Sequence, residues 1–349
     1  MKLKVIMVLL AISFGLSACK KDFTKPEHSQ NKSEKTAEAY RLNNWMGDIF
    51  AERQDEKLSE IVMPGAHDAA TYKITTGSDW ARDASWFKKL GGKRPAFFWS
   101  FTTRNNIYGL LNIGVRNFDL RIEHNDKGYY SYHGLISTNA EEIIGDLKRY
   151  FDEHPKEIAH LELRADQMSD SEYETLLRMI VDGVGKDRVL ASTDNIRPND
   201  PIGKYWENGK NLLISCGRTS SDSEYDKYAL RGFMYSTWAN SSWASRVEEY
   251  MWVNIRTRPM DQLYASSMTQ TPDSDVIAHG IISTPKSLED LCTYGSKWGA
   301  INTEVNMWLP HLGKEASLQG KKVNIVTVDF PEFNNITRTI IDYNFVQMK

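Results

Sequence analysis

The stretch Ile61-Val-Met-Pro-Gly-Ala-His67-Asp68 is an apolar run that ends in a histidine and a carboxylate. Two similar stretches follow it, Val115-Arg-Asn-Phe-Asp119-Leu-Arg121 and Tyr132-His133-Gly134. Runs of this kind are typical of buried strands that deliver their last side chains to one end of a sheet or barrel. The three stretches therefore predict a site that contains two histidines and an arginine.

These side chains favour chemistry on a phosphodiester. A histidine can serve as base or acid near neutral pH, because its unperturbed pKa lies there. The guanidinium group of an arginine presents a planar fork of donors that suits a phosphate. A base and an acid on two sides of phosphorus, with a fixed cation beside it, would supply the needs of an internal displacement.

The composition sets limits on the function. A hydrophobic fraction of 41% over 349 residues is enough for a large core. The net charge of −3 gives no basic footprint, so we expect no nucleic-acid partner. Ten tryptophans and sixteen tyrosines suit either a binding cleft or membrane interface, or simply an aromatic core.

The first residues predict a lipoprotein signal. Lys2 and Lys4 precede an apolar stretch at residues 5–16 that is too short to span a bilayer. The next residues, Leu16-Ser-Ala-Cys19, resemble the lipobox of bacterial lipoproteins, in which the chain is cut before a cysteine that carries the lipid. An ordinary secretory peptide is the alternative.

The chain therefore divides into three expected parts. Residues 1–18 would be the signal peptide, and residues 19–42, which are rich in Lys, Glu, Ser and Asn, a flexible tether. Residues 43–349 would form one globular domain, anchored in the cell envelope on its periplasmic or cell-surface face. Cys216 and Cys292 could pair in an oxidising compartment, but Cys216 lies in an apolar run and suits a buried thiol.

Apolar runs alternate with amphipathic ones along the domain. The expected strands are residues 60–63, 115–122, 129–133, 158–163, 211–216, 232–235, 300–303 and 323–330. The expected helices are residues 108–111, 140–154, 169–184, 287–294 and 334–345, with a further helical pattern at 43–52. This alternation predicts an α/β fold, a TIM-like (βα)8 barrel in a single catalytic domain. The aromatic segment 77–104 suits a loop over the site.

The same motifs resemble the X-domain of bacterial phosphatidylinositol-specific phospholipases C, which implies a distorted barrel. The likeness extends over about residues 57–345 and is thin between 190 and 300. It rests on Pro64-Gly-Ala-His67-Asp68, on residues 114–121, on His133-Gly134, on residues 151–164 and on Val326-Thr-Val-Asp329-Phe330.

The resemblance implies a role for each catalytic residue. His67 would be the base that takes the proton of the inositol 2-hydroxyl, and His133 the acid that protonates the diacylglycerol oxygen. Asp329 would orient His67, and Asp68 would partner His133. Arg121 would bind a non-bridging phosphate oxygen. The implied substrate is phosphatidylinositol or a glycosylated form of it, met at a membrane surface by a monomer.

The resemblance carries over to the head group less clearly. Arg164 and Asp166 match residues that contact the inositol ring, and Arg218 falls close to another inositol-binding arginine. Trp238 lies in the segment Tyr235-Ser-Thr-Trp238-Ala-Asn240, where further ring contacts are expected.

Arg121 also bears on the cofactor. In calcium-dependent relatives a metal supplies the positive charge that Arg121 would supply here, so we expect no metal and no other cofactor. A calcium site built from Asp119, Glu123 and Glu162 is the alternative.

Two other functions stay open. The barrel could cleave another glycerophospho- or sphingolipid head group, although no acidic metal-ligand set follows His67. It could also be an inactive surface lipoprotein that binds glycan or lipid through its aromatic side chains.

Overall fold

The computed structural model describes residues 40–219, 224–309 and 321–347. Its strands are β1 (Met63–Ala66), β2 (Asn117–Asn125), β3 (Gly128–His133), β4 (Leu135–Asn139), β5 (Ala159–Arg164), β6 (Leu212–Ser215), β7 (Met234–Trp238), β8 (Leu263–Met268) and β9 (Ile325–Val328). Its α-helices are α1 (Trp45–Ile49), α2 (Ser85–Lys88), α3 (Lys93–Ser100), α4 (Ile107–Asn112), α5 (Ala140–Glu153), α6 (Asp170–Val184), α7 (Ile202–Glu207), α8 (Ala244–Thr257), α9 (Ser274–Gly280), α10 (Ile301–Trp308) and α11 (Ile336–Gln347). The expected signal peptide, Cys19 and most of the expected tether lie outside the described residues.

The strands form a distorted barrel that does not close. Strands β7, β8, β9, β1, β2, β5 and β6 pair in that order and run parallel. Among the described strands β6 does not pair with β7, so a seam stays open there. The antiparallel strands β3 and β4 extend the outer end of β2. The predicted α/β distorted barrel is therefore confirmed.

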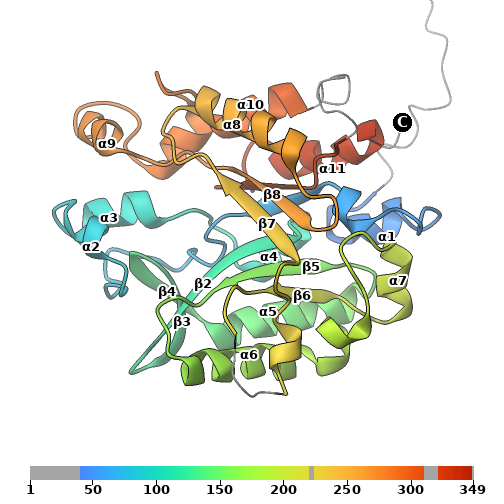
Figure 1. The fold of residues 1–349 in the computed structure, drawn as a ribbon. Helices are drawn as coiled ribbons and strands as arrows, with labels where there is room; N and C mark the ends of the chain where they lie inside the picture. The colour runs from blue at the N-terminus through green and yellow to red at the C-terminus, as the bar shows by residue number, and fades with distance from the viewer. Residues whose placement is uncertain (1–39, 220–223, 310–320, 348–349) are drawn as a thin grey trace, which may run out of the picture. The chain divides into compact units, whose positions relative to one another are not determined.

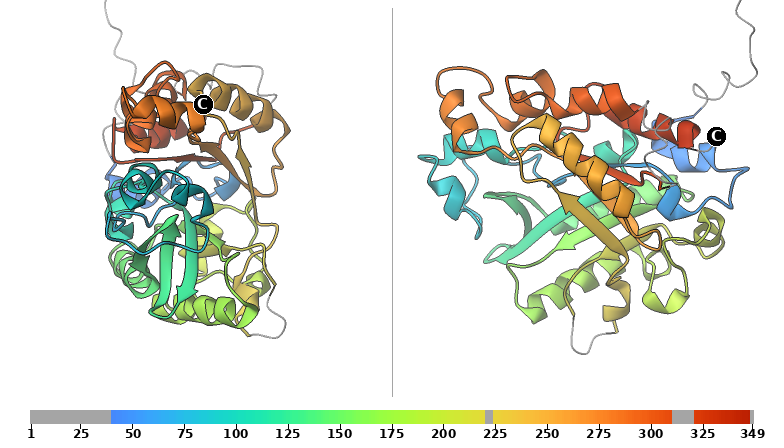
Figure 2. Two further views of the ribbon diagram at one scale, coloured as in Figure 1. Left: turned by 90° about the vertical axis from the view of Figure 1, so that its left-hand side faces the viewer. Right: turned by 45° about the horizontal axis from the view of Figure 1, so that its top comes forward.

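Helices pack against the outside of the barrel in two groups. Helices α5 and α6 cover β2, β5 and β6, whereas α8, α10 and α11 cover β8 and β9 (Figures 1 and 2). A third apolar cluster lies inside the barrel, where alternate strand residues such as Met63, Leu213 and Ile325 meet α1. Alternation along each strand thus feeds both an outer and an inner core.

Two predicted helices begin where their capping residues indicate. The Asn139 side chain accepts the Glu142 N–H at 2.8 Å at the start of α5. At the start of α6, Ser169 and Glu172 form a reciprocal capping box. Such caps satisfy backbone donors that the first helical turn leaves unpaired.

Other element predictions were wrong. Residues 300–303 begin α10 instead of forming a strand, and the barrel strand at that point is β8, whose sequence Leu-Tyr-Ala-Ser-Ser-Met lacks the usual Val and Ile. The first strand covers Met63–Ala66, three residues later than expected. The segment 77–104 is not all loop, because it contains α2 and α3.

Gly65 lets β1 approach its neighbours closely. A Cβ at this position would lie 2.6 Å from the Thr327 hydroxyl on β9 and 3.1 Å from the Asn117 amide on β2. Only a residue without a side chain leaves room for both. The strand that carries His67 is therefore held tightly between β2 and β9.

A fully buried ion pair stabilises the end of the barrel at which the parallel strands begin. Arg116 and Glu157 are both 0% exposed, and Arg116 Nε donates to Glu157 at 2.8 Å. The Arg116 guanidinium also donates to the carbonyls of Leu111 and Val115, and Glu157 accepts the Gly47 N–H. The pair joins the segment before β2 to the segment before β5.

We expect Glu157→Gln to lower the free energy of unfolding by about 3–5 kcal/mol, because it leaves the Arg116 charge buried without a counter-charge. Denaturant unfolding of the two proteins would measure this loss. Lys148→Gln is the control, since the Lys148–Asp152 pair is exposed and such pairs contribute less than about 1 kcal/mol. Equal stability of Glu157→Gln and the parent protein would contradict this account.

Candidate active site

A cavity of about 700 Å³ opens at the carboxyl ends of the parallel strands. Side chains from the ends of these strands line it, and the segment 77–104 contributes further residues. In α/β barrels this end carries the functional groups, because the strands deliver their last side chains there. Residues on the parallel strands or directly after them line the cavity, among them His67, Asp119, Arg121, Glu162, Arg164, Ser236, Ser267, Thr327 and Asp329.

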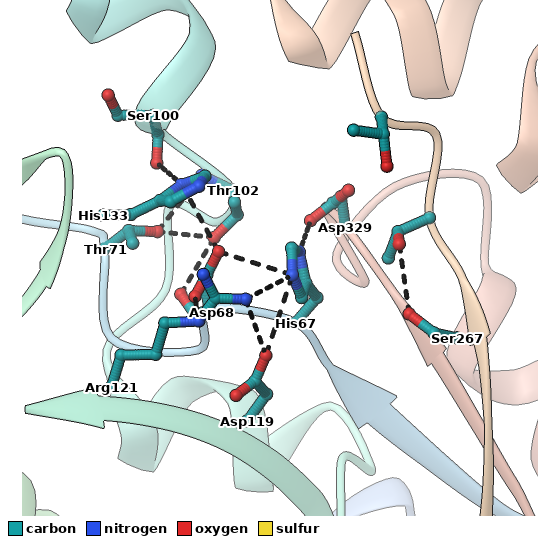
Figure 3. Close-up of polar contacts among 12 residues, drawn as sticks. His67, Asp68, Thr71, Ser100, Thr102, Asp119, Arg121, His133, Ser267 and Asp329 are labelled. Atoms are coloured by element: carbon teal, nitrogen blue, oxygen red, sulfur yellow. Dashed lines mark hydrogen bonds and ion pairs between the residues drawn. The ribbon is translucent and has the colours of Figure 1, made fainter. Parts of the chain in front are cut away.

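His67 is fixed from two sides of the barrel. Its backbone N–H donates to the Val328 carbonyl at 3.0 Å, and its Nδ1 lies 2.8 Å from Asp329 Oδ1 (Figure 3). The Nδ1–H therefore donates a hydrogen bond to the carboxylate, and in the neutral ring the lone pair is then on Nε2, which faces the cavity. The structure brings these two residues together as the sequence predicted.

Asp68 lies between three positively charged or titratable groups. Its carboxylate is 2.6 Å from Arg121 Nε, 3.3 Å from His133 Nδ1 and 3.4 Å from His67 Nε2. Its backbone has a φ of 42°, a left-handed conformation that is rare outside glycine. The Thr102 hydroxyl donates to the Asp68 carbonyl at 2.9 Å and holds this turn. Asp68 contacts His133, its predicted partner, and makes a shorter contact with Arg121.

His133 faces His67 across the cavity. The two ring centroids are 6.2 Å apart, and His133 Nδ1 donates to the Ser100 carbonyl at 2.9 Å. The ring of Phe87 packs edge-on against His133 at 5.1 Å. Gly134 has a φ of 69°, and a Cβ there would lie 2.2 Å from the Phe87 ring, so glycine is required.

Arg121 is the cation at the centre of the site. Its Nη2 lies 3.1 Å from His67 Nε2 and 3.4 Å from Asp119 Oδ2 (Figure 3). The other carboxylate oxygen of Asp119 accepts from Arg164 Nε at 3.0 Å. Asp119 therefore connects the two arginines that line the cavity.

These contacts change the pKa values of the site. Burial alone would lower the pKa of His67, but the carboxylates of Asp68 and Asp329 raise it to about 9. Burial alone would raise the pKa of Asp68, but Arg121, His133 and His67 lower it to about 2. Burial alone would lower the pKa of the Arg121 guanidinium. The carboxylates of Asp68 and Asp119 outweigh this effect and raise that pKa.

One group of described residues has the spacing of a metal site. One ligand atom each from His67, Asp68 and Asp119 lies within 4.8 Å of the others. The guanidinium of Arg121 contacts all three, at 3.1, 2.6 and 3.4 Å, so a cation is already in place among them. The expectation that no metal is needed stays a prediction.

The alternative calcium set is not brought together. Asp119 and Glu162 are neighbours across β2 and β5. Glu123 is buried, and its carboxylate accepts the Arg82 N–H at 2.8 Å, outside the cavity lining. Glu162 contacts Arg164 and the Ser236 hydroxyl. The alternative triplet of Asp119, Glu123 and Glu162 therefore does not form a single site.

The expected head-group residues divide into two sets. Arg164, Asp166 and Trp238 line the cavity, and Trp238 is half exposed with its indole N–H donated to the Thr271 hydroxyl at 3.0 Å. Arg218 does not line it. Its guanidinium donates to the Ala165 carbonyl at 2.8 Å and to the Met168 carbonyl, so it supports the turn after β5 instead.

The sequence interpretation missed the cavity residues that the segment 77–104 supplies. Their signal was the aromatic content of that segment, which was predicted to lie over the site but not assigned residue by residue. The carboxylate of Asp83 also accepts the Gly134 N–H at 3.1 Å, beside His133. These residues are Asp83, Trp86, Phe87 and Trp99.

The two cysteines of the barrel are not joined by a disulfide. Cys216 and Cys292 are both buried and free, so they do not pair. Cys292 Sγ lies 3.8 Å from Asp329 Oδ2, behind the carboxylate that contacts His67. Among the described residues, no helix has the length and apolar character needed to cross a bilayer.

The chain is similar to several known proteins over much of its length. No model of a protein family matches the chain. PI-PLC X domain-containing protein 3 of Homo sapiens is 24% identical over 335 residues, which cover 91% of this chain and 97% of that protein. PI-PLC X domain-containing protein 2 of Mus musculus is 25% identical over 338 residues, which cover 89% and 90%. A PI-PLC X-box domain-containing protein of Dictyostelium discoideum is 29% identical over 168 residues, which cover 47% of this chain but 22% of that protein.

Solved structures show the same fold. A variant of the phosphatidylinositol-specific phospholipase C of Staphylococcus aureus has a TM-score of 0.60 at 18% identity and covers 87% of this chain and 96% of that one. The enzyme of Listeria monocytogenes has a TM-score of 0.59 at 15% identity and covers 86% and 98%. The chain thus has the distorted barrel of bacterial phosphatidylinositol-specific phospholipases C, and its sequence likeness to PI-PLC X-domain proteins supports a place in that family.

Proposed function

We propose that this protein is a phosphatidylinositol-specific phospholipase C that needs no metal ion. It would cleave the phosphodiester between inositol phosphate and diacylglycerol. The observation that carries the proposal is the convergence of His67, His133 and Arg121 in one cavity, with the two histidine rings 6.2 Å apart. The likeness to PI-PLC X-domain proteins supports it.

The proposed reaction is an internal displacement at phosphorus. The inositol 2-hydroxyl oxygen forms a bond to phosphorus while His67 Nε2 takes its proton. The bond from phosphorus to the glycerol oxygen breaks, and that oxygen takes a proton from His133 Nε2. The products are a cyclic inositol phosphate and diacylglycerol, so one proton is taken and one is given back.

The remaining residues position these groups. Asp329 accepts a hydrogen bond from the Nδ1–H of His67, which leaves Nε2 as the base. Arg121 would contact a non-bridging phosphate oxygen, and its contacts with Asp68 and Asp119 fix the guanidinium before substrate arrives. A preorganised cation of this kind stabilises the charge that develops on the phosphate. Arg164, Asp166 and Trp238 would bind the inositol ring.

Exposed apolar side chains near the cavity support a membrane surface as the partner. Trp86 on α2 and Phe98 on α3 are 39% and 40% exposed, and Ile281 and Ile282 after α9 are 80% and 84% exposed. Helices α2, α3 and α9 lie on the same side of the barrel in both orientations (Figures 1 and 2). Large exposed apolar side chains of this kind are typical of interaction surfaces. We propose that this side contacts the lipid.

The amino-terminal residues add an anchor to the proposal. We propose that the chain is cut before Cys19 and lipidated there, which would hold the barrel at the cell envelope near its substrate. The residues between Cys19 and the barrel would act as a tether.

We expect His67→Ala and His133→Ala each to lower kcat on phosphatidylinositol vesicles by about 10²–10⁴-fold, because each removes a proton-transfer group. Release of diacylglycerol in the presence of a chelator measures the rate. His154→Ala is the control, because His154 lies at the end of α5, away from the cavity.

Full activity in either histidine variant would contradict the mechanism. Activity that disappears with the chelator and returns with calcium would contradict the role given to Arg121. Binding of phosphatidylinositol vesicles with no turnover by the parent protein would favour the alternative of an inactive lipid-binding protein.

We expect the pH profile of kcat/KM to respond to Asp329→Asn. The base form of His67 is neutral, so in the parent protein its limb rises with pH up to about 9. Removing one of the carboxylates that raise the pKa of His67 should move this limb to lower pH by roughly 1–2 units. Loss of ring orientation should also lower the maximum rate by roughly 10²-fold.

The same change has a signature in stability. Because the pKa of His67 is raised above 6.5, its pairing stabilises the folded protein fully below pH 6.5, and this contribution is lost as pH rises through about 9. Unfolding of Asp329→Asn should show a smaller loss between pH 6.5 and 9, because Asp68 still raises the pKa of His67 in this variant. An unchanged imidazole titration of His67 by NMR in this variant would contradict the pairing.

For the anchor, we expect Cys19→Ser to abolish incorporation of a labelled fatty acid into the protein made in bacterial cells. The variant should also leave the membrane fraction for the soluble fraction, because the acyl chains are its proposed attachment. Cys216→Ser is the control, since that thiol is buried. Equal labelling of Cys19→Ser and the parent protein would reject the lipoprotein signal.

A further inference from the structure

The wall of the active-site cavity is divided by chemistry. One part carries charged and polar side chains from β2, β5 and β7, namely Asp119, Arg121, Glu162, Arg164, Asp166 and Ser236. The other part is apolar and comes from α2, α3 and the segments on both sides of α9, namely Trp86, Phe87, Trp99, Pro272 and Leu288. We refer to these five residues as the aromatic wall.

The aromatic wall is well packed. Trp86 and Phe87 meet edge-to-face with ring centroids 4.8 Å apart. Trp99 and Leu288 are 4% and 3% exposed, so both are held by the protein core and present only a small face to the cavity. A preformed apolar surface binds an apolar group without first paying to order its own side chains.

His133 lies where the two parts of the wall meet. Its Nδ1 donates to the Ser100 carbonyl at the end of α3, so Nε2 is the nitrogen available to the cavity. The ring of Phe87 packs against the imidazole at 5.1 Å. An oxygen atom that takes a proton from His133 therefore lies next to the aromatic wall, and the carbon atoms bonded to that oxygen continue along it.

Building on the function proposed above, we propose that the aromatic wall binds the glycerol backbone and the first methylenes of an acyl chain of the leaving diacylglycerol. The cavity itself would then select an acylated leaving group over a bare glycerol, before any contribution from a membrane. This assignment follows from the order of the groups along the substrate. The head group would bind the polar part of the wall, the leaving oxygen would lie at His133, and the glycerol backbone bonded to that oxygen would then reach the aromatic wall.

The size of the effect follows from apolar burial. Covering two or three methylenes favours binding by roughly 10- to 50-fold, at the usual value for each buried methylene. The gain is expected in kcat/KM, since the contact forms with the substrate and is still present at the transition state.

The test compares two soluble substrates in the absence of any membrane. Dihexanoyl phosphatidylinositol, used below the concentration at which it forms micelles, carries short acyl chains, and glycerophosphoinositol carries none. We expect the parent protein to show a kcat/KM ratio of at least roughly 10 in favour of the acylated substrate. We expect Trp86→Ala and Leu288→Ala each to lower this ratio several-fold.

Trp243→Ala is the matched control. Trp243 is 39% exposed, like Trp86, but it does not line the cavity, so its loss should leave the ratio unchanged. The half-exposed Trp86 is easier to truncate without unfolding than the buried Leu288, so the two variants together separate a lost contact from a damaged fold.

A ratio near 1 in the parent protein would overturn the inference while leaving the proposed function intact. A high ratio that neither variant lowers would also overturn it, because selection would then be made elsewhere. Cleavage of neither these substrates nor phosphatidylinositol vesicles would reject the proposed function, and the inference with it.

Discussion

The guanidinium group of Arg121 contacts two carboxylates and the base histidine at the centre of the site. Asp68 holds its Nε, Asp119 holds its Nη2, and His67 Nε2 lies 3.1 Å away. Removing this cation would leave the buried carboxylate of Asp68 facing two histidines with its main counter-charge gone. The left-handed turn at Asp68, held by the hydrogen bond from Thr102, positions this carboxylate. The geometry of both histidines therefore depends on one ion-pair network.

The barrel places this network at one end of a cavity whose two sides differ in polarity. Parallel strands bring groups from β1, β2, β5 and β9 to one end, while the hairpin of β3 and β4 carries His133 to the opposite side of the same space. The segment with α2 and α3 then adds an apolar surface next to His133. Under the proposed function, a substrate with one charged end and one apolar end would bind with its apolar leaving group next to His133, the proposed acid.

Two arginines in one motif show how far sequence interpretation can reach. Arg116 and Arg121 are five residues apart in the same apolar stretch, and both are charged side chains of equal length. Arg116 is 0% exposed and pairs with Glu157 to stabilise the fold, whereas Arg121 lines the cavity. Because the two arginines are five residues apart, the alternation of side chains along a strand predicts that they point to opposite faces, but it does not say which face lines the cavity. Arg218 likewise lies outside the lining of this cavity, because its partners are carbonyls of a turn about fifty residues away.

The sequence by itself determined the fold class and the positions of His67, Arg121, His133 and Asp329 at strand ends, because apolar runs that end in polar residues are local patterns set by burial. Local patterns did not determine which carboxylate contacts which cation: the contact of Asp329 with His67 spans 262 residues of chain, and only the family resemblance implied it. Nor did local patterns identify β8, whose burial comes from pairing with β7 and β9 and not from its own composition. Contacts between distant segments decided these features, and they include the aromatic wall that gives the cavity its direction.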